Sequence, residues 1–275
     1  MMMTAQSPLK ILAAAACALA LAGCAGFPST AGKVSKAEPA APELAIQSWQ
    51  TDQGAKVLFV PSDALPMLDV RLVMHAGGSR DGDQPGLASL TSALIGEGAE
   101  GLSVDDIARG FEDRGAHFST GSYQDMGVVS LRTLSKPEWR DDAVDLLARV
   151  VGRPTFPQDA LDRLRTRAMQ GLKMEKQVPG PQVDKAFQRA VFGDHPYGHA
   201  DSGTLDSLPG ITREDLRRFH GRYYAAGNTV IALVGDVSRE QAEAIANELS
   251  AALPDGGPAP DLPGRRKPPS GSLST

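Results

Sequence analysis

The sequence predicts an α+β two-layer sandwich, in which helices cover one face of a mixed and mostly antiparallel sheet. Two strand-turn-strand patterns occur, at residues 44–60 and 117–134, and such hairpins give antiparallel pairing. Strands and helices do not alternate strictly along the chain, which argues against a doubly wound parallel sheet. A late apolar run, 229–234, is short enough to be a central strand.

The composition is that of a globular protein with a mild acidic balance. The chain has 275 residues, a net charge of −5 and 41% hydrophobic residues, which is enough for one large domain or two small ones. It lacks the basic patch that marks a nucleic-acid-binding protein, so we expect no nucleic-acid partner.

Changes in composition divide the chain into four regions. We expect a signal peptide at 1–23, a disordered tether rich in Ala, Pro, Lys and Ser at 24–43, a folded domain at 44–253 and a Pro/Gly-rich linker at 254–275. No regular element is predicted within the linker.

The sequence Leu-Ala-Gly-Cys at 21–24 resembles the lipobox of bacterial lipoproteins. Lys10 precedes an apolar run that has the length of a signal-peptide core and is too short to span a membrane. The Cys24 thiol is the group that would carry lipid, and Cys17 lies inside the signal, so no disulfide is expected. Ala25 follows the cysteine where Asp would favour the inner membrane. The resemblance therefore implies a periplasm-facing lipoprotein, with the outer membrane favoured.

The first half of the folded region is predicted to be rich in strands. Gly54 belongs to a turn, and the segment 67–75 alternates apolar and polar side chains, as a strand with one buried face does. Ser103 and Asp106 have the spacing of a capping box. The predicted elements are strands 44–51, 56–60 and 67–75, helices 86–98 and 103–114, and strands 117–123 and 126–134.

The second half is predicted to be mainly helical. Pro137 opens a helix, and the pairs Thr212–Asp215 and Ser238–Gln241 have the spacing of capping boxes. The predicted elements are helices 137–151, 158–176, 183–192 and 212–224, strand 229–234 and helix 238–253.

The predicted helix at 86–98 is the centre of the functional argument. Leu87, Leu90 and Leu94 recur at helical spacing, which predicts one buried face. A second face carries only small residues: Ser89, Ser92 and Ala93. Without further context, this is a short core helix with small residues on its second side.

Two separated blocks of the sequence resemble the pitrilysin/insulinase-type zinc peptidases, family M16. The first block is Gly78-Ser79-Arg80 followed by Gly86-Leu87-Ala88. The second is His195-Pro196-Tyr197-Gly198, then Gly203-Thr204, Leu208, Ile211-Thr212, Asp215-Leu216, Phe219, Tyr223-Tyr224, Asn228 and Val234-Gly235-Asp236. The resemblance covers about 44–253 and is to the family's first homologous domain. It implies the M16 metallohydrolase-like fold, with a second domain missing after the linker.

The chemistry of the active family members is absent from this sequence. They carry a His-x-x-Glu-His motif, in which two histidines hold zinc and the glutamate is the general base. The matching positions here are Ser89, Ser92 and Ala93. The third ligand, a Glu in the family, falls near Gln170, and Glu175 is the nearest acid further along. We therefore expect no catalytic residue, no zinc and no other cofactor.

No other group of side chains suggests a replacement site. His195 and His199 are four residues apart, but the Pro and Gly between them exclude a regular helix, so we expect a turn in which His195 contacts backbone. Asp105 and Asp106 are expected at a helix N-terminus, where they complement the dipole. The other histidines are expected at the surface or satisfied: His75, His117, and His220 on the exposed side of its helix.

Taken together, the resemblance implies a non-catalytic peptide-binding or scaffolding subunit that partners an active M16 zinc peptidase. Family members bind peptides as an added strand at a sheet edge, which needs backbone groups and no zinc. The alternative is an active zinc metalloendopeptidase with a rearranged site, and a third possibility is a purely structural envelope component.

Overall fold

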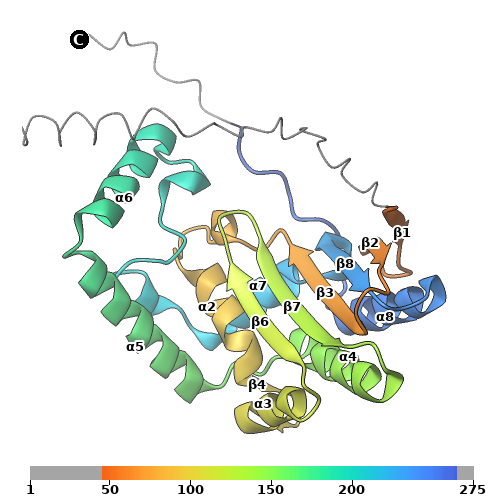
Figure 1. The fold of residues 1–275 in the computed structure, drawn as a ribbon. Helices are drawn as coiled ribbons and strands as arrows, with labels where there is room; N and C mark the ends of the chain where they lie inside the picture. The colour runs from red at the N-terminus through yellow and green to blue at the C-terminus, as the bar shows by residue number, and fades with distance from the viewer. Residues whose placement is uncertain (1–44, 265–275) are drawn as a thin grey trace, which may run out of the picture. The chain divides into compact units, whose positions relative to one another are not determined.

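A computed structural model describes residues 45–264 of the chain. Its main feature is a six-stranded sheet with the order β1-β2-β8-β3-β7-β6. In the view of Figure 1 one face of this sheet is turned toward the reader, and helices lie behind the other. The predicted α+β fold with a mixed, mostly antiparallel sheet is therefore confirmed.

The sheet contains both predicted hairpins, and β8 lies near its middle, as predicted for the apolar run at 229–234. Both hairpins form, β1 with β2 and β6 with β7, and β3 lies antiparallel to β7 and β8. The pairing of β2 with β8 is parallel. The strands are β1 (Gln47–Gln50), β2 (Lys56–Pro61), β3 (Met67–Met74), β6 (His117–Ser122), β7 (Gly127–Leu134) and β8 (Thr229–Gly235).

Strand β3 shows how the sheet divides core from solvent. Leu68 and Leu72 are fully buried on the face that the helices cover. Asp69 and Arg71 alternate with them and lie on the open face, where the Asp69 carboxylate pairs with Arg132 of β7 at 2.6 Å. The predicted alternation is confirmed, because successive side chains of a strand point to opposite faces.

The helices begin close to the predicted positions because local capping sets their starts. The pairs Ser103–Asp106, Thr212–Asp215 and Ser238–Gln241 all form capping boxes. The helices are α2 (Leu87–Leu94), α3 (Val104–Glu112), α4 (Pro137–Gly152), α5 (Gln158–Glu175), α6 (Pro179–Phe192), α7 (Arg213–Tyr223) and α8 (Arg239–Ala252).

Three local features differ from the sequence prediction. The helix predicted at 86–98 ends at Leu94, because a 3-10 turn, η2 (Ile95–Glu97), follows it and Gly98 already belongs to a strand. Helix α6 begins at Pro179, where a proline suits the first helical turn, and not at residue 183. A small additional sheet pairs β4 (Gly98–Ala99) with β5 (Leu102–Ser103). Strands of two residues show no hydrophobic periodicity, so sequence patterning does not reveal them.

The segment after α8 has no regular element, as predicted, but it is bound along the domain. The N–H of Ala259 donates to the side chain of Asn228 at 2.9 Å, and Arg80 donates to the carbonyl of Pro260 at 2.5 Å. Further on, the carbonyl of Pro263 lies 2.9 Å from Nε2 of His195. The described part of this segment therefore follows a defined path.

The lipobox at 21–24, the tether and the end of the linker lie outside the described residues. Among residues 45–264, no helix has both the length and the apolar character needed to cross a bilayer.

Candidate functional site

Helix α2 begins in a tight turn that uses a buried carboxylate as its cap. Gly86, the N-cap, has a φ of 95°, and a Cβ there would stand 2.9 Å from the Cα of Gly203, so glycine is required. The Asp81 carboxylate accepts hydrogen bonds from the N–H groups of Gly86 and Ala88, both at 2.7 Å. Burial raises the pKa of Asp81 to about 7, although these two donors oppose the rise. The negative charge of the nearby Asp201 carboxylate raises the pKa of Asp81 further.

The four positions that the resemblance aligns with the family's zinc site differ in their environment. On α2, Ser92 is buried, Ser89 is half-buried and Ala93 is exposed. Gln170 is exposed on α5, a helix that packs against α2. The structure thus places the four residues on two adjacent helices, as the resemblance implies.

These four residues do not fit a zinc ion. Zinc in proteins is held by imidazole nitrogen, thiolate sulfur or carboxylate oxygen. Two serine hydroxyls, an alanine methyl and a carboxamide supply none of these. Across residues 45–264, moreover, no three His, Cys, Asp or Glu side chains are grouped so that they could hold a metal.

Ser92 is part of the packing between α2 and the sheet. Its carbonyl accepts a hydrogen bond from the Thr120 hydroxyl of β6 at 2.9 Å. Its side chain is 3% exposed and lies beside the fully buried hydroxyl of Tyr224, whose pKa burial raises. The position that the resemblance aligns with the family's general base is therefore occupied by a small residue inside the protein.

The acids near the expected third ligand are engaged in ion pairs. Glu175 at the end of α5 binds Lys185 of α6 at 2.7 Å. Glu97, just after α2, binds Arg163 of α5 at 2.6 Å and has only 17% of its side chain exposed. The sequence analysis did not single out Glu97, because sequence spacing does not predict an ion pair between residues 66 positions apart. Both acids join helices rather than complete a metal site.

The predicted turn at His195 is confirmed. A 3-10 turn, η3 (Pro196–Gly198), separates His195 from His199. Nδ1 of His195 accepts from the N–H of Tyr197 at 3.2 Å, so its Nε2 carries the proton and donates to the carbonyl of Pro263. Burial lowers the pKa of His199, although the backbone of Ala200 opposes this. The two imidazoles do not share the i, i+4 geometry of a zinc-binding helix.

The expectation that His220 is exposed is wrong. His220 is 6% exposed, stacks on Tyr224 at 5.1 Å between ring centroids, and lies 2.7 Å from the carbonyl of Val151. It belongs with Leu216 and Phe219 to the buried face of α7. Because a carbonyl only accepts, Nε2–H is the donor. Burial lowers the pKa of His220 to about 4.

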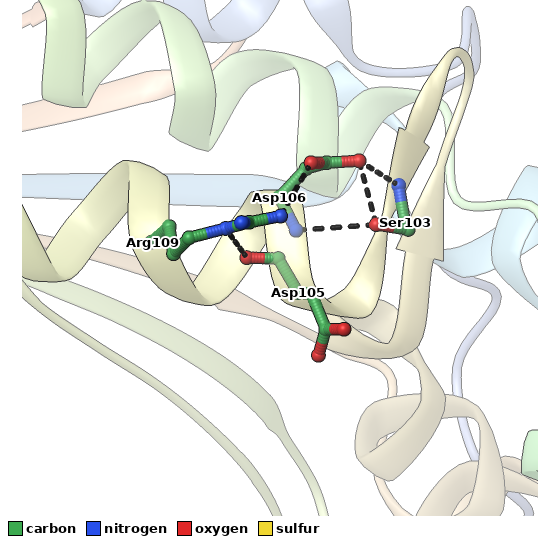
Figure 2. Close-up of polar contacts among 4 residues, drawn as sticks. All are labelled: Ser103, Asp105, Asp106 and Arg109. Carbon is green, nitrogen blue, oxygen red and sulfur yellow. Dashed lines mark hydrogen bonds and ion pairs between the residues drawn. The ribbon is translucent and has the colours of Figure 1, made fainter.

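At the start of α3, Asp106 completes the predicted capping box, and Asp105 lies in the first turn of the helix. Figure 2 shows the Asp106 carboxylate accepting from Ser103 and from Arg109, while the Asp105 side chain points away from it. The hydrogen bonds from Ser103 lower the pKa of Asp106. The two carboxylates therefore do not form a catalytic pair.

Comparison with protein families identifies the family to which this fold belongs. Residues 58–204 match the model described as Insulinase (Peptidase family M16), and residues 210–273 match the one described as Peptidase M16 inactive domain. The chain belongs to peptidase family M16. The first sequence block lies within the first match, and the second block is divided between the two matches.

Individual M16 relatives carry two kinds of description. A solved structure described as a peptidase M16 inactive domain from Pseudomonas fluorescens is 48% identical, with a TM-score of 0.81, and the match covers 82% of this chain and 55% of that one. The "Non-peptidase homolog YmxG" of Helicobacter pylori is 25% identical over 73% of this chain and 46% of its own length. Other relatives bear the description "Uncharacterized zinc protease", including one from Rickettsia felis that is 23% identical over 77% of this chain and 51% of its own length.

The M16 fold itself is shared more widely. Pitrilysin has a TM-score of 0.70 at 20% identity, with 81% of this chain and 24% of that chain covered, which shows similarity of fold alone. The chain spans about half the length of the curated relatives that it matches.

Proposed function

We propose that this M16 chain is a non-catalytic subunit that holds a peptide segment as an added strand on β6, next to α2, and works beside a catalytic M16 paralogue. The observation that carries the proposal is the edge position of β6 in the sheet, alongside a helix whose zinc-ligand positions have lost their ligands. An unpaired edge strand is a ready template for a further strand.

The hydrogen-bonding pattern of the hairpin shows which groups of β6 are available. Tyr123 directly follows β6, and its N–H donates at 2.8 Å to the carbonyl of Met126, which directly precedes β7. The backbone N–H of Tyr123 therefore points toward the β7 side. Successive residues of an antiparallel strand alternate between pointing toward the partner and away from it. The backbone N–H and C=O groups of Phe118, Thr120 and Ser122 are therefore directed away from β7 and toward the free edge.

The environment of α2 favours holding a peptide over cleaving it. Hydrolysis in this family needs a metal to polarise the carbonyl and a carboxylate to take the proton of the attacking water. A serine hydroxyl at position 92 is no general base near neutral pH, and Ala93 offers no donor. Backbone pairing along β6 requires neither group.

Thr120→Pro is expected to weaken peptide binding at least about tenfold, which corresponds to about 1.4 kcal/mol. The proline removes an outward N–H and places its ring at the edge, yet the N–H groups that face β7 remain, and edge strands tolerate proline. Thr120→Val is the matched control, because it also loses the hydroxyl that bonds Ser92 but keeps the backbone N–H. The measurement is fluorescence anisotropy with a short labelled peptide of alternating Thr and Val flanked by lysines.

The same pair of variants tests the partnership. Adding the wild-type chain or Thr120→Val to an intact catalytic M16 paralogue should raise that enzyme's activity or its peptide affinity, and Thr120→Pro should not. Equal peptide binding by Thr120→Pro and Thr120→Val would contradict the edge-strand proposal. No effect of any variant on the paralogue would contradict the partnership.

We also propose that the protein is attached to the cell envelope by lipid on Cys24, a residue outside the described region. The support is the agreement of the charged start, the apolar core and the Leu-Ala-Gly-Cys sequence. Cells grown with a clickable palmitate analogue should label the wild-type protein, and Cys24→Ser should abolish the label. Cys17→Ser, which changes the other cysteine, is the control. Equal labelling of wild type and Cys24→Ser would refute the anchor.

A further inference from the structure

Helix α6 carries an apolar stripe that no part of residues 45–264 covers. Val183, Phe187 and Val191 follow one another at intervals of four residues, so they lie along one side of the helix. Their exposed fractions are 64%, 65% and 54%. No residue of α6 is buried, which is unusual for a helix with this much apolar surface.

The helix is held to the domain through its other side. Phe192 contacts the ring of Tyr197 edge-on, with centroids 5.5 Å apart, and Lys185 binds Glu175 of α5. At 100° per residue, positions 185 and 192 lie on the side of the helix opposite Phe187. Figure 1 shows α6 at the margin of the fold, beyond α5 and away from the sheet. The α6 stripe, Val183 with Phe187 and Val191, therefore faces outward.

Contiguous exposed apolar surface of this kind marks an interaction site. The lengths of the relatives indicate what could cover it. The match covers 55% of the Pseudomonas fluorescens chain, and it covers 48% of the first half of the periplasmic protease PqqL from Escherichia coli. These proteins thus carry about as much chain again beyond the portion that resembles this domain.

The path of the C-terminal segment leads to α6. After α8 the segment is bound by Asn228 and Arg80, and the carbonyl of Pro263 then meets His195, three residues beyond the end of α6. Pro263 therefore lies close to the C-terminal end of α6. A domain connected here would need only a short connection to reach the stripe.

We propose that the α6 stripe is the docking surface for a second domain of the size that the relatives carry in the other half of their chains. Phe187, the largest and most exposed of the three side chains, is the central contact. This inference goes beyond the peptide-binding role and does not depend on the edge of β6.

The test compares this chain with the Pseudomonas fluorescens relative, whose chain continues beyond the 55% that the match covers. Phe187→Asp in this 275-residue chain should change the melting temperature by no more than about 1 °C, because the side chain is exposed. Aspartate at the aligned residue of the relative should lower its melting temperature by at least about 5 °C or split the transition in two. The matched control is Leu65→Asp in this chain, at a loop position that is 63% exposed, and aspartate at the aligned position of the relative.

Three other results would overturn the proposal. The first is an effect in the relative no larger than that of the Leu65 control. The second is destabilisation of this chain by Phe187→Asp, which would show that the stripe packs within its own domain. The third is a different occupant: a dimer seen by light scattering, or binding to phosphatidylglycerol vesicles, that Phe187→Asp abolishes.

Discussion

The wild-type chain is expected to show no chelator-sensitive hydrolysis of a fluorogenic peptide. Variants with one, two or three substitutions are expected to remain without this activity. Ser92→Glu supplies a base without a metal. Ser89→His with Ala93→His supplies two ligands without the third. Zinc binding and general-base catalysis each contribute orders of magnitude in rate, so partial restoration leaves the barrier nearly unchanged.

Only the quadruple variant, which adds Gln170→Glu, restores the complete donor set. The structure adds an obstacle, because position 92 is buried beside Tyr224 and against β6. A carboxylate there is desolvated unless the metal neutralises it, so Ser92→Glu alone should also lower stability. The quadruple variant is therefore the one in which zinc should both bind and stabilise the fold.

Metal analysis after dialysis, run beside the peptide assay, completes this experiment. Wild type should retain well under one zinc per chain, and the quadruple variant should retain more than the double histidine variant. Turnover by the wild-type chain that a chelator abolishes would overturn the non-catalytic assignment. One tightly held zinc in the wild type would direct attention to His195 and His199.

The free energy of unfolding is expected to fall as the pH is lowered from about 6.5 to about 4, through His220. The pKa of this imidazole is about 4 in the folded protein and near 6.5 when unfolded, so in this window the unfolded chain binds a proton that the folded chain does not. The stabilisation is complete above pH 6.5 and is lost on acidification. A shift of this size corresponds to about 3 kcal/mol.

Asp81 acts in the opposite direction. Its folded pKa of about 7 lies above the ordinary value of 3.8, so its contribution favours the folded state at low pH and is lost as the pH rises toward 7. The wild-type profile contains both effects. The experiment must therefore compare two proteins that both contain Asp81.

His220→Gln isolates the histidine, because glutamine keeps a donor for the carbonyl of Val151 but cannot gain a charge. Urea unfolding should show that the stability of wild type relative to this variant falls by about 3 kcal/mol between pH 7 and pH 4. His117→Gln, at an exposed position in β6, is the matched control. A difference between wild type and His220→Gln that is constant with pH would contradict the burial argument.

Much of the fold could be predicted because its signals are local. Capping boxes at Ser103, Thr212 and Ser238 set helix starts, and the alternation along β3 assigns its two faces before any pairing is known. The degenerate zinc positions were also visible in the sequence, since a residue without a suitable donor atom cannot hold the metal in any fold. The match to family M16 confirmed the resemblance that gave those positions their meaning.

The sequence alone determined the chemistry that is absent at α2, because donor types are a property of the residues Ser89, Ser92, Ala93 and Gln170. Tertiary packing decided what stands there instead, since burial depends on neighbours far along the chain. It placed Ser92 beside Tyr224, brought the His220 imidazole into hydrogen-bonding contact with the carbonyl of Val151, and paired Glu97 with Arg163. It also left the α6 stripe uncovered, which periodicity cannot reveal, because an apolar helix face looks the same whether its partner lies in the same domain or in another.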